Sequence, residues 1–392
     1  MINERMLGLG KQPNPIRVQY AYGLKRKAEI GEENVYDLSI GNPSIPAPPA
    51  VRARIEELLE EPPEVLHGYT MAAGLESARQ AVADNLRERF GIPATAAQVY
   101  LTAGATAALY ITTAAITHPG DEVIVNAPYF TEYKVMIESA QCSCVEVPMR
   151  ASDFQLDIDA LRTAINAKTA AVVINSPNNP VGCIYTEQNI KDLAAMLEEK
   201  EAEVGHPIYL ISDEPYREIT YGKEVPFTVN YYRDTIVCYS WAKSLSLPGE
   251  RIGYIYVSDL MGDAADVAAA VGGAGRALGF ICAPVLFQRV IETCINEPTN
   301  VDAYAANRAL LTGMLDELGY EYIQPDGAFY LWVKALEDDS QAFCDKARNH
   351  DLLLVNSDCF GVPGWARAGY CVSATTIKNS RKAWEALKTD YE

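Results

Sequence analysis

The sequence predicts an α/β fold in which a large domain carries a mostly parallel, doubly wound sheet and a smaller α+β domain completes the chain. The chain has 392 residues, which is too long for one ordinary hydrophobic core and indicates two domains. From about residue 95 to about residue 260, apolar strand patterns alternate with helical patterns, as in parallel sheets with helices on both faces. Beyond about residue 300 the pattern changes, which indicates the second domain.

Polar residues directly follow four apolar segments of the predicted large domain. These segments are typical of buried strands and span residues 99–102, 170–175, 208–212 and 235–239. The first runs into an Ala-rich helix that opens near Gly104, and the third ends at Asp213. In open, mostly parallel α/β sheets, ligands bind beyond the carboxyl ends of the strands. We therefore expect one binding site where these strand ends meet.

The C-terminal part of the chain has a different pattern. Residues 304–318 have the spacing of an amphipathic helix, and residues 328–333 and 369–373 are short apolar segments typical of strands. We expect these elements to form the smaller domain.

Composition excludes several classes of protein. The formal net charge of −19 argues against nucleic-acid binding, which needs a basic face. No run of about 18 uninterrupted apolar residues occurs, so we expect no membrane span. The first residues lack the apolar core of a signal peptide. The nine cysteines are scattered, and Cys142 and Cys144 have no second pair to complete a zinc site, which predicts a cytoplasmic protein without a metal.

Lys243 is the most informative single residue. It follows the strand at 235–239 in the sequence Ser240-Trp241-Ala242-Lys243, and Arg251 stands eight positions further on. A lysine after a strand, with an arginine nearby, suits a carbonyl cofactor that carries a phosphate. The amine would form a Schiff base with the carbonyl, and Ser240 and Arg251 would hold the phosphate.

Three motifs give the chain a resemblance to a known family. Asn-Pro-x-Gly begins at Asn179, Asp-x-x-Tyr spans Asp213 to Tyr216, and Ser-x-x-Lys ends at Lys243 with Arg251 eight residues later. In this order, the motifs resemble those of the class I/II aminotransferases, the aspartate aminotransferase-like enzymes of fold type I that depend on pyridoxal 5′-phosphate (PLP). The resemblance covers almost the whole chain. It implies that residues 1–40 join the small domain, residues 41–299 form the large domain, and residues 300–392 form the small one.

The resemblance assigns roles around the cofactor ring. Asp213 would pair with the pyridine nitrogen and keep it protonated, which makes the ring an electron sink. Tyr216 and Asn179 would hydrogen-bond the phenolic oxygen, and Phe130 would stack on the ring. Lys243 would also move a proton between the substrate α-carbon and the cofactor. A plain turn at Asn179 and a core position for Phe130 are alternative interpretations of these two residues.

The resemblance also implies a phosphate site. Gly104, Ala105 and Thr106 would open a helix whose free N–H groups suit a dianion, with Ser240 and Arg251 completing the site. Ala242 stands where many family members carry a hydroxyl, which removes one minor contact. Tyr69 matches a tyrosine that reaches the phosphate from a neighbouring subunit, which implies a homodimer with shared sites.

The resemblance also implies which residues bind the substrate. Arg367 matches the arginine that binds the substrate α-carboxylate, Asn179 would contribute to the same site, and the backbone of Gly41 would border it. Arg276 lies amid small and apolar residues, at a spacing where aspartate-specific relatives carry an arginine that binds a distal carboxylate. Such an arginine would be buried against an anion, either a substrate carboxylate or a structural partner such as Asp263 or Asp266.

These patterns predict a cytoplasmic, homodimeric, PLP-dependent aminotransferase acting on small amino acids and 2-oxo acids. The best expectation for the donor is aspartate and for the acceptor 2-oxoglutarate. Two alternatives stay open: a PLP-dependent C–S β-lyase, and an aminotransferase that prefers alanine or aromatic amino acids. Many of the lyases carry His where this chain has Tyr216, which favours transfer. A PLP-binding regulator would need a DNA-binding domain before residue 36, where only about 30 residues stand.

Overall fold

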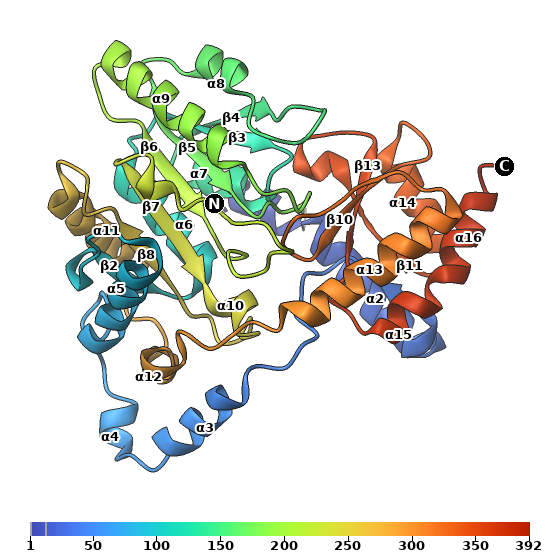
Figure 1. Cartoon of the computed structure of the whole chain (residues 1–392), viewed down its shortest axis with the longest axis horizontal. Coiled ribbons are helices and arrows are strands. Elements are labelled where there is room, and N and C mark those ends of the chain that lie inside the picture. Colours follow the sequence, from blue (N-terminus) through green and yellow to red (C-terminus); the bar gives the residue numbers. More distant parts are fainter. Residues whose placement is uncertain (1, 12–13) are drawn as a thin grey trace.

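A large sheet forms the centre of the computed structural model, which describes residues 2–11 and 14–392 (Figure 1). The sheet has seven strands in the order β2-β8-β7-β6-β5-β3-β4. All of them run parallel except β8, which is antiparallel to both of its neighbours. The strands are β2 (Val99–Thr102), β3 (Glu122–Ala127), β4 (Ser143–Pro148), β5 (Thr169–Asn175), β6 (Tyr209–Asp213), β7 (Thr235–Ser240) and β8 (Gly253–Val257). The predicted α/β class with a mostly parallel sheet is therefore confirmed.

Helices cover both faces of this sheet because its strands are apolar on both sides. In β7, Ile236 and Cys238 pack in one hydrophobic cluster with α6 and α11, whereas Val237 and Tyr239 pack in another with α5 and α12. This alternation is the signature of a strand buried on both faces. The helices of the large sheet are α5 (Glu76–Phe90), α6 (Gly104–Ile116), α7 (Glu132–Ser139), α8 (Ile158–Ala164), α9 (Glu187–Val204), α10 (Trp241–Ser244), α11 (Ala264–Leu278) and α12 (Val285–Cys294).

A second, antiparallel sheet lies in the C-terminal part, in the order β12-β13-β10-β9. The elements here are β9 (Tyr322–Ile323), β10 (Tyr330–Lys334), β12 (Val355–Asn356), β13 (Trp365–Gly369), α13 (Val301–Leu318), α14 (Ser340–Asn349), α15 (Ala374–Asn379) and α16 (Arg381–Thr389). The predicted helix at 304–318 lies within α13. The strand predicted at 369–373 was wrong in position, because β13 ends at Gly369 and the Ser373 side chain caps α15 by accepting a hydrogen bond from the Thr376 N–H.

The N-terminal segment contacts both parts of the molecule: Arg5 donates a hydrogen bond to Ser139 of α7, whereas the later residues lie with the C-terminal part. It contains α1 (Glu4–Lys11), α2 (Pro15–Ile30) and β1 (Tyr36–Asp37), and β1 pairs in parallel with β11 (Leu352–Leu353). Figure 1 shows α2 beside the C-terminal helices. The domain limits at residues 40 and 299 stay a prediction. Short 3₁₀ segments complete the chain: η1 (Glu32–Asn34), η2 (Ala96–Gln98), η3 (Thr228–Asn230) and η4 (Ser357–Phe360).

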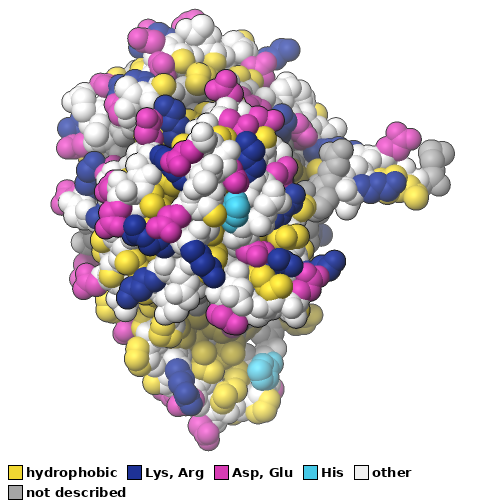
Figure 2. Space-filling model, turned by 90° about the vertical axis from the view of Figure 1, so that its right-hand side faces the viewer, with side chains coloured by type: hydrophobic (Ala, Val, Ile, Leu, Met, Phe, Trp, Pro, Cys, Tyr) yellow, Lys and Arg dark blue, Asp and Glu magenta, His cyan; other side chains and the backbone are white. Residues whose placement is uncertain are grey.

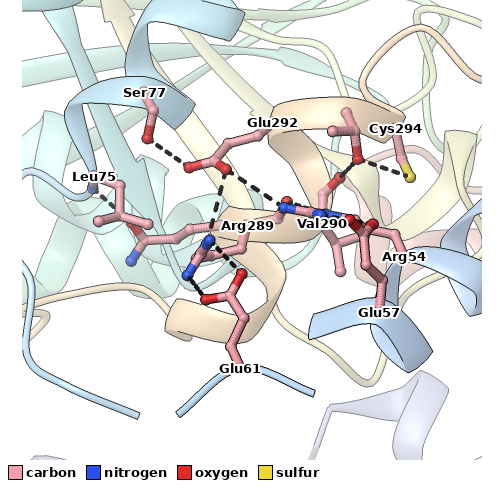
Figure 3. A network of polar contacts seen from close by, with 11 residues as sticks. Arg54, Glu57, Glu61, Leu75, Ser77, Arg289, Val290, Glu292 and Cys294 are labelled. Carbon is pink, nitrogen blue, oxygen red and sulfur yellow. Dashed lines mark hydrogen bonds and ion pairs between the residues drawn. The ribbon is translucent and has the colours of Figure 1, made fainter. Parts of the chain in front are cut away.

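Two short helices, α3 (Pro49–Leu58) and α4 (Pro63–Leu66), form an arm at the lower end of the molecule in Figure 1. A polar network ties this arm to α12 (Figure 3). Arg289 of α12 binds Glu61 with two hydrogen bonds, of 2.6 and 2.8 Å. Glu292 of α12 accepts a hydrogen bond from Ser77 and lies 4.0 Å from the Arg54 guanidinium. The arm is thus fixed to the large-sheet helices at its base.

None of the helices in residues 2–11 and 14–392 combines the length and the apolar character that a membrane span requires.

We predict that Gly253→Ala destabilises the protein by about 1–3 kcal/mol, the usual range for overpacking a core. A Cβ at Gly253 would collide with the Tyr239 carbonyl oxygen and lie 3.0 Å from the Gly104 Cα, where β8 meets the start of α6. The free energy of unfolding in denaturant measures the effect. Gly273→Ala is the control, because a Cβ there meets nothing within 4 Å. Equal stability of the two variants would contradict the close packing at Gly253.

Candidate active site

The carboxyl ends of three neighbouring parallel strands supply the first polar groups of the site. β5 ends at Asn175, β6 at Asp213 and β7 at Ser240. The register pairs Asn175 with Asp213, and Asp213 with Cys238 of β7, so these ends lie at one edge of the sheet. The sequence-based expectation that the strand ends meet at one place holds for these strands.

A cavity of about 490 Å³ lies above this edge. It is lined by residues of the large sheet, of the C-terminal sheet and of the N-terminal segment. The predicted site residues that line it are Gly41, Ala105, Thr106, Phe130, Asn179, Asp213, Tyr216, Ser240, Lys243, Arg251 and Arg367. Sequence reasoning therefore identified residues that are far apart in the chain and adjacent in the structure.

The N-terminus of α6 opens toward the cavity. Its first residue, Gly104, has a φ of +82°, a backbone conformation that favours glycine, and a Cβ there would lie 2.6 Å from Arg251 Nη2. No side chain of a described residue caps the helix. Its first N–H groups are therefore free, and with Ala105 and Thr106 facing the cavity they form a site suited to an anion. Arg251 donates to the carbonyl oxygens of Pro248 and Ala103, at 2.9 and 3.3 Å.

Lys243 lies in α10, a single helical turn that follows β7. Ser240 caps this turn, because its hydroxyl accepts a hydrogen bond from the Ala242 N–H at 3.2 Å. Lys243 Nζ donates to the Gly41 carbonyl oxygen at 2.5 Å. Burial is the largest influence on this amine and lowers its pKa to about 8, and the positive charges of Arg367 and Arg251 act in the same direction. A substantial fraction of the amine is therefore neutral near pH 8.

Asp213 is buried and has one free oxygen. Its Oδ2 accepts a hydrogen bond from the Tyr133 hydroxyl at 2.5 Å, whereas its Oδ1 has no hydrogen-bond partner among the described residues. Burial raises the pKa of Asp213 to about 7, although the Tyr133 hydroxyl opposes the shift. A cationic donor beside Oδ1 would favour the carboxylate, so this atom is suited to a protonated nitrogen of a bound molecule.

Tyr216 and Asn179 lie on the side of the cavity nearest the C-terminal sheet. The hydroxyl of Tyr216 is 3.1 Å from that of Tyr330, and burial raises the pKa of Tyr216 well above its ordinary value. The Asn179 N–H donates to Asn175 Oδ1 at 2.7 Å, which fixes the loop after β5. Gly41 lies so close to Tyr330 that a Cβ would collide with its hydroxyl. Tyr330 is a lining residue that sequence reasoning missed.

Arg367 is a buried cation without an anionic partner. It lies on β13 with 1% of its surface exposed, and it forms no ion pair with any residue that the structure describes. Its Nη1 donates to Asn179 Oδ1 at 2.9 Å, and its Nη2 donates to the Ser39 carbonyl oxygen at 2.6 Å. Its Nε has no partner among the described residues. Because a buried charge needs compensation, this guanidinium is suited to an anion that enters the cavity.

Phe130 has features of both interpretations of the sequence, a core position and a position in the binding site. It packs partly against the hydrophobic cluster below the sheet and also lines the cavity. Its ring meets that of Tyr133 edge to face, with 5.7 Å between ring centroids. Tyr133, whose hydroxyl donates to Asp213, is a residue that sequence reasoning missed.

Three of the predicted site residues, Gly104, Tyr69 and Arg276, are not among the lining residues, although Gly104 directly precedes Ala105 at the start of α6. Tyr69 is fully exposed, at 101% of its reference surface. Arg276 is also exposed and forms no ion pair with any described residue, so the alternative of a structural partner such as Asp263 or Asp266 was wrong, whereas its binding of a substrate carboxylate stays a prediction. The small residues Ala274 and Gly275 of α11 pack inward, which turns the next position, Arg276, outward. Their predicted roles across a subunit boundary stay predictions.

The N-terminal helix α2 supplies a wall of the cavity that sequence reasoning missed. Asn14, Ile16, Arg17 and Tyr20 line it. No motif in this segment pointed to the site, because its approach depends on the pairing of β1 with β11, which brings the N-terminus to the C-terminal part.

The arrangement has counterparts in known proteins. The family model described as "Aminotransferase class I and II" matches residues 33–387, most of the chain. The chain belongs to this family. It is therefore an aminotransferase, and the resemblance based on Asn179, Asp213, Tyr216 and Lys243 led to the correct family.

Individual relatives support the same conclusion. The aspartate aminotransferase of Thermotoga maritima is 29% identical, over 95% of this chain and 96% of that protein. The crystal structure of an aminotransferase from Eubacterium rectale is 51% identical, with a TM-score of 0.97 over 100% of this chain and 99% of that one. The aspartate aminotransferase of Thermus thermophilus with maleate is 26% identical, with a TM-score of 0.88 over 99% of both chains. The fold of this aminotransferase is thus that of its family.

We predict that covalent labelling of Lys243 by a small aldehyde, trapped with borohydride, rises with pH through about 8. The reason is that only the neutral amine attacks a carbonyl, and burial lowers the pKa of Lys243 to about 8. Peptide mass spectrometry of the cofactor-free protein over pH 6–11 measures the labelling, normalised to a short lysine peptide in the same sample. A rise that follows the reference peptide would contradict the lowered pKa.

Proposed function

We propose that this aminotransferase uses pyridoxal 5′-phosphate, held covalently by Lys243, to move an amino group from an L-amino acid to a 2-oxo acid. The observation that carries the proposal is the unpartnered, buried Oδ1 of Asp213 in the same cavity as Lys243, whose pKa is lowered to about 8. A buried acceptor and a reactive amine in one cavity match a ligand that has a protonated ring nitrogen and a carbonyl carbon.

The residues of the cavity fit this cofactor group by group. The free end of α6, with Ser240 and Arg251, suits the phosphate. Asp213 suits the ring nitrogen, Asn179 and Tyr216 suit the ring oxygen, and Phe130 suits the ring face. When bound, the cofactor supplies an electron sink for the pair left when the substrate α-proton departs.

The protein's own residues then orient the substrate and move the proton. Arg367 would bind the α-carboxylate, because its buried guanidinium has no anionic partner among the described residues and keeps Nε free. Lys243 Nζ would take the α-proton, which a neutral amine with a pKa of about 8 can do near neutral pH. The Gly41 carbonyl oxygen, 2.5 Å from Nζ, holds the amine at that end of the cavity.

For the substrates, we propose aspartate as donor and 2-oxoglutarate as acceptor. Relatives over nearly the full chain length are aspartate aminotransferases by name. Three arginines, Arg17, Arg251 and Arg367, line the cavity, which favours anionic ligands. No observation favours the β-lyase alternative, and Tyr216 lies in the cavity as the transferase interpretation requires.

We propose a homodimer with shared sites, in the cytoplasm. The arm of α3 and α4, with the loop after α4, exposes Leu59, Val65, Tyr69 and Met71, and Figure 2 shows hydrophobic side chains gathered at this lower end. Such an exposed apolar surface suits a second copy of the chain. The cysteines are all free thiols, which suits a reducing compartment.

Lys243→Ala tests the proposed chemistry. We expect transamination to be lost, because no other described lysine lines the cavity. The variant should still bind the cofactor through the phosphate site, but without the visible absorption band of the lysine-bound form. Donor-coupled assays and spectra measure both effects. Near wild-type turnover by the variant would show that the role given to Lys243 is wrong.

Tyr69→Phe tests the shared site. If Tyr69 donates to the phosphate of the neighbouring subunit, the variant should bind the cofactor more weakly and reconstitute more slowly from the cofactor-free protein. Tyr231→Phe, at a partly exposed tyrosine outside the cavity whose hydroxyl bonds only Glu187 among the described residues, controls for the loss of a hydroxyl in general. Sedimentation measures the assembly state. A fully active monomer would contradict both the dimer and the role of Tyr69.

A further inference from the structure

The start of α2 is fixed over the cavity by one side chain. Asn14 accepts a hydrogen bond from the Ile16 N–H at 2.8 Å and thereby caps α2. Its amide nitrogen donates to Thr131 Oγ1 at 2.6 Å and to Glu132 Oε1 at 2.7 Å, at the start of α7. The first turn of α2 is therefore held to the large sheet's own helix, although α2 as a whole lies with the C-terminal part. This anchoring places Arg17 and Tyr20 at the cavity wall.

Among the cations that line the cavity, Arg17 has no side-chain partner within residues 2–11 and 14–392. The other three are already in contact with the protein: Lys243 with Gly41, Arg251 with two carbonyl oxygens, and Arg367 with Asn179 and Ser39. The Arg17 side chain forms no hydrogen bond or ion pair with any residue in the described ranges, although the acidic residue Glu132 lines the same cavity.

We propose that Arg17 binds the distal carboxylate of the substrate and so makes this site selective for dicarboxylic amino acids and 2-oxo acids. The proposal rests on the proposed function, in which Arg367 holds the α-carboxylate. Arg367 is buried and Arg17 is exposed at the wall, so the two guanidiniums lie at different depths of one cavity. Each planar guanidinium group can bind a carboxylate with two hydrogen bonds. A substrate with two carboxylates then satisfies both.

Two other residues could recognise the substrate side chain, but their positions suit this role less well than that of Arg17. Arg276 is exposed on α11 and outside this cavity, so it could act only across a subunit boundary. Glu132 could bind a cationic side chain, but its Oε1 already accepts a hydrogen bond from Asn14. Glu132 also stands in the first turn of α7, where the helix dipole stabilises a carboxylate. Arg17 has neither kind of compensation.

The test compares donors with and without a second carboxylate. In Arg17→Gln, kcat/KM for aspartate and glutamate should fall about tenfold, the scale for losing a hydrogen bond to a charged group. The kcat/KM for alanine and phenylalanine should change less than about threefold, since Arg17 lies outside the proposed contacts of the α-carboxylate. Arg17→Lys should recover part of the loss because it keeps the charge. Lys25→Gln is the matched control, since Lys25 is an exposed cation of the same helix with 80% of its side chain accessible.

A binding measurement separates recognition from turnover. Calorimetry of the purified holoenzyme with succinate and with butyrate compares two four-carbon acids that differ by one carboxylate. Arg17→Gln should weaken the binding of succinate about tenfold and leave the binding of butyrate nearly unchanged. Because neither acid can be transaminated, this result does not depend on the proposed reaction.

Three outcomes would overturn the role of Arg17. Equal losses on all donors, together with unchanged succinate binding, would make Arg17 structural. A loss of kcat/KM that is specific to aspartate in Arg276→Gln but absent in Arg17→Gln would mean that Arg276 of the partner subunit binds the distal carboxylate. A preference for lysine and arginine that Glu132→Gln abolishes would mean a cationic substrate. A wild-type enzyme inactive on every donor would instead overturn the proposed function, and the succinate titration would still decide the role of Arg17.

Discussion

Two buried charges without counter-charges, on Asp213 and Arg367, are the constraint on which the site depends. Neither forms an ion pair with a described residue, and burial raises the pKa of Asp213 to about 7. An isolated charge costs free energy in the interior unless it is compensated. Each has one buried atom without a hydrogen-bond partner in the described part of the chain, Oδ1 of Asp213 and Nε of Arg367. A bound cationic nitrogen would favour the Asp213 carboxylate, and a bound carboxylate would compensate Arg367, so both contacts would contribute to ligand binding.

The position of these charges depends on three parts of the chain meeting at one place. The parallel register of β5, β6 and β7 brings Asp213 to the edge of the large sheet. Arg367 comes from the antiparallel C-terminal sheet and reaches back to Asn179 of the large-sheet loops. The N-terminal segment contributes carbonyl oxygens, from Ser39 to Arg367 and from Gly41 to Lys243. A change in how the two sheets meet would therefore alter the α-carboxylate site and the lysine together.

Sequence reasoning reached the large sheet and most of the cavity because the signals there are local. Apolar strands that end in polar residues predict a site at the sheet edge, and the spacing from Asp213 to Tyr216 is readable directly. Tyr330 and Arg17 carried no such signal, because they reach the cavity only through the packing of the C-terminal sheet and of α2. The error at Arg276 has a related cause: composition shows that its neighbours are small, but the phase of α11 decides which of them face inward.

The most direct measurement is the site of covalent attachment in the native holoenzyme. Borohydride reduction fixes a cofactor that is bound to a lysine amine, and peptide mass spectrometry then identifies that lysine. We predict one modified peptide, which carries the reduced cofactor on Lys243, the lysine that lines the cavity with Asp213. Modification of a different lysine, or a catalytically active holoenzyme with no modified lysine, would contradict the account.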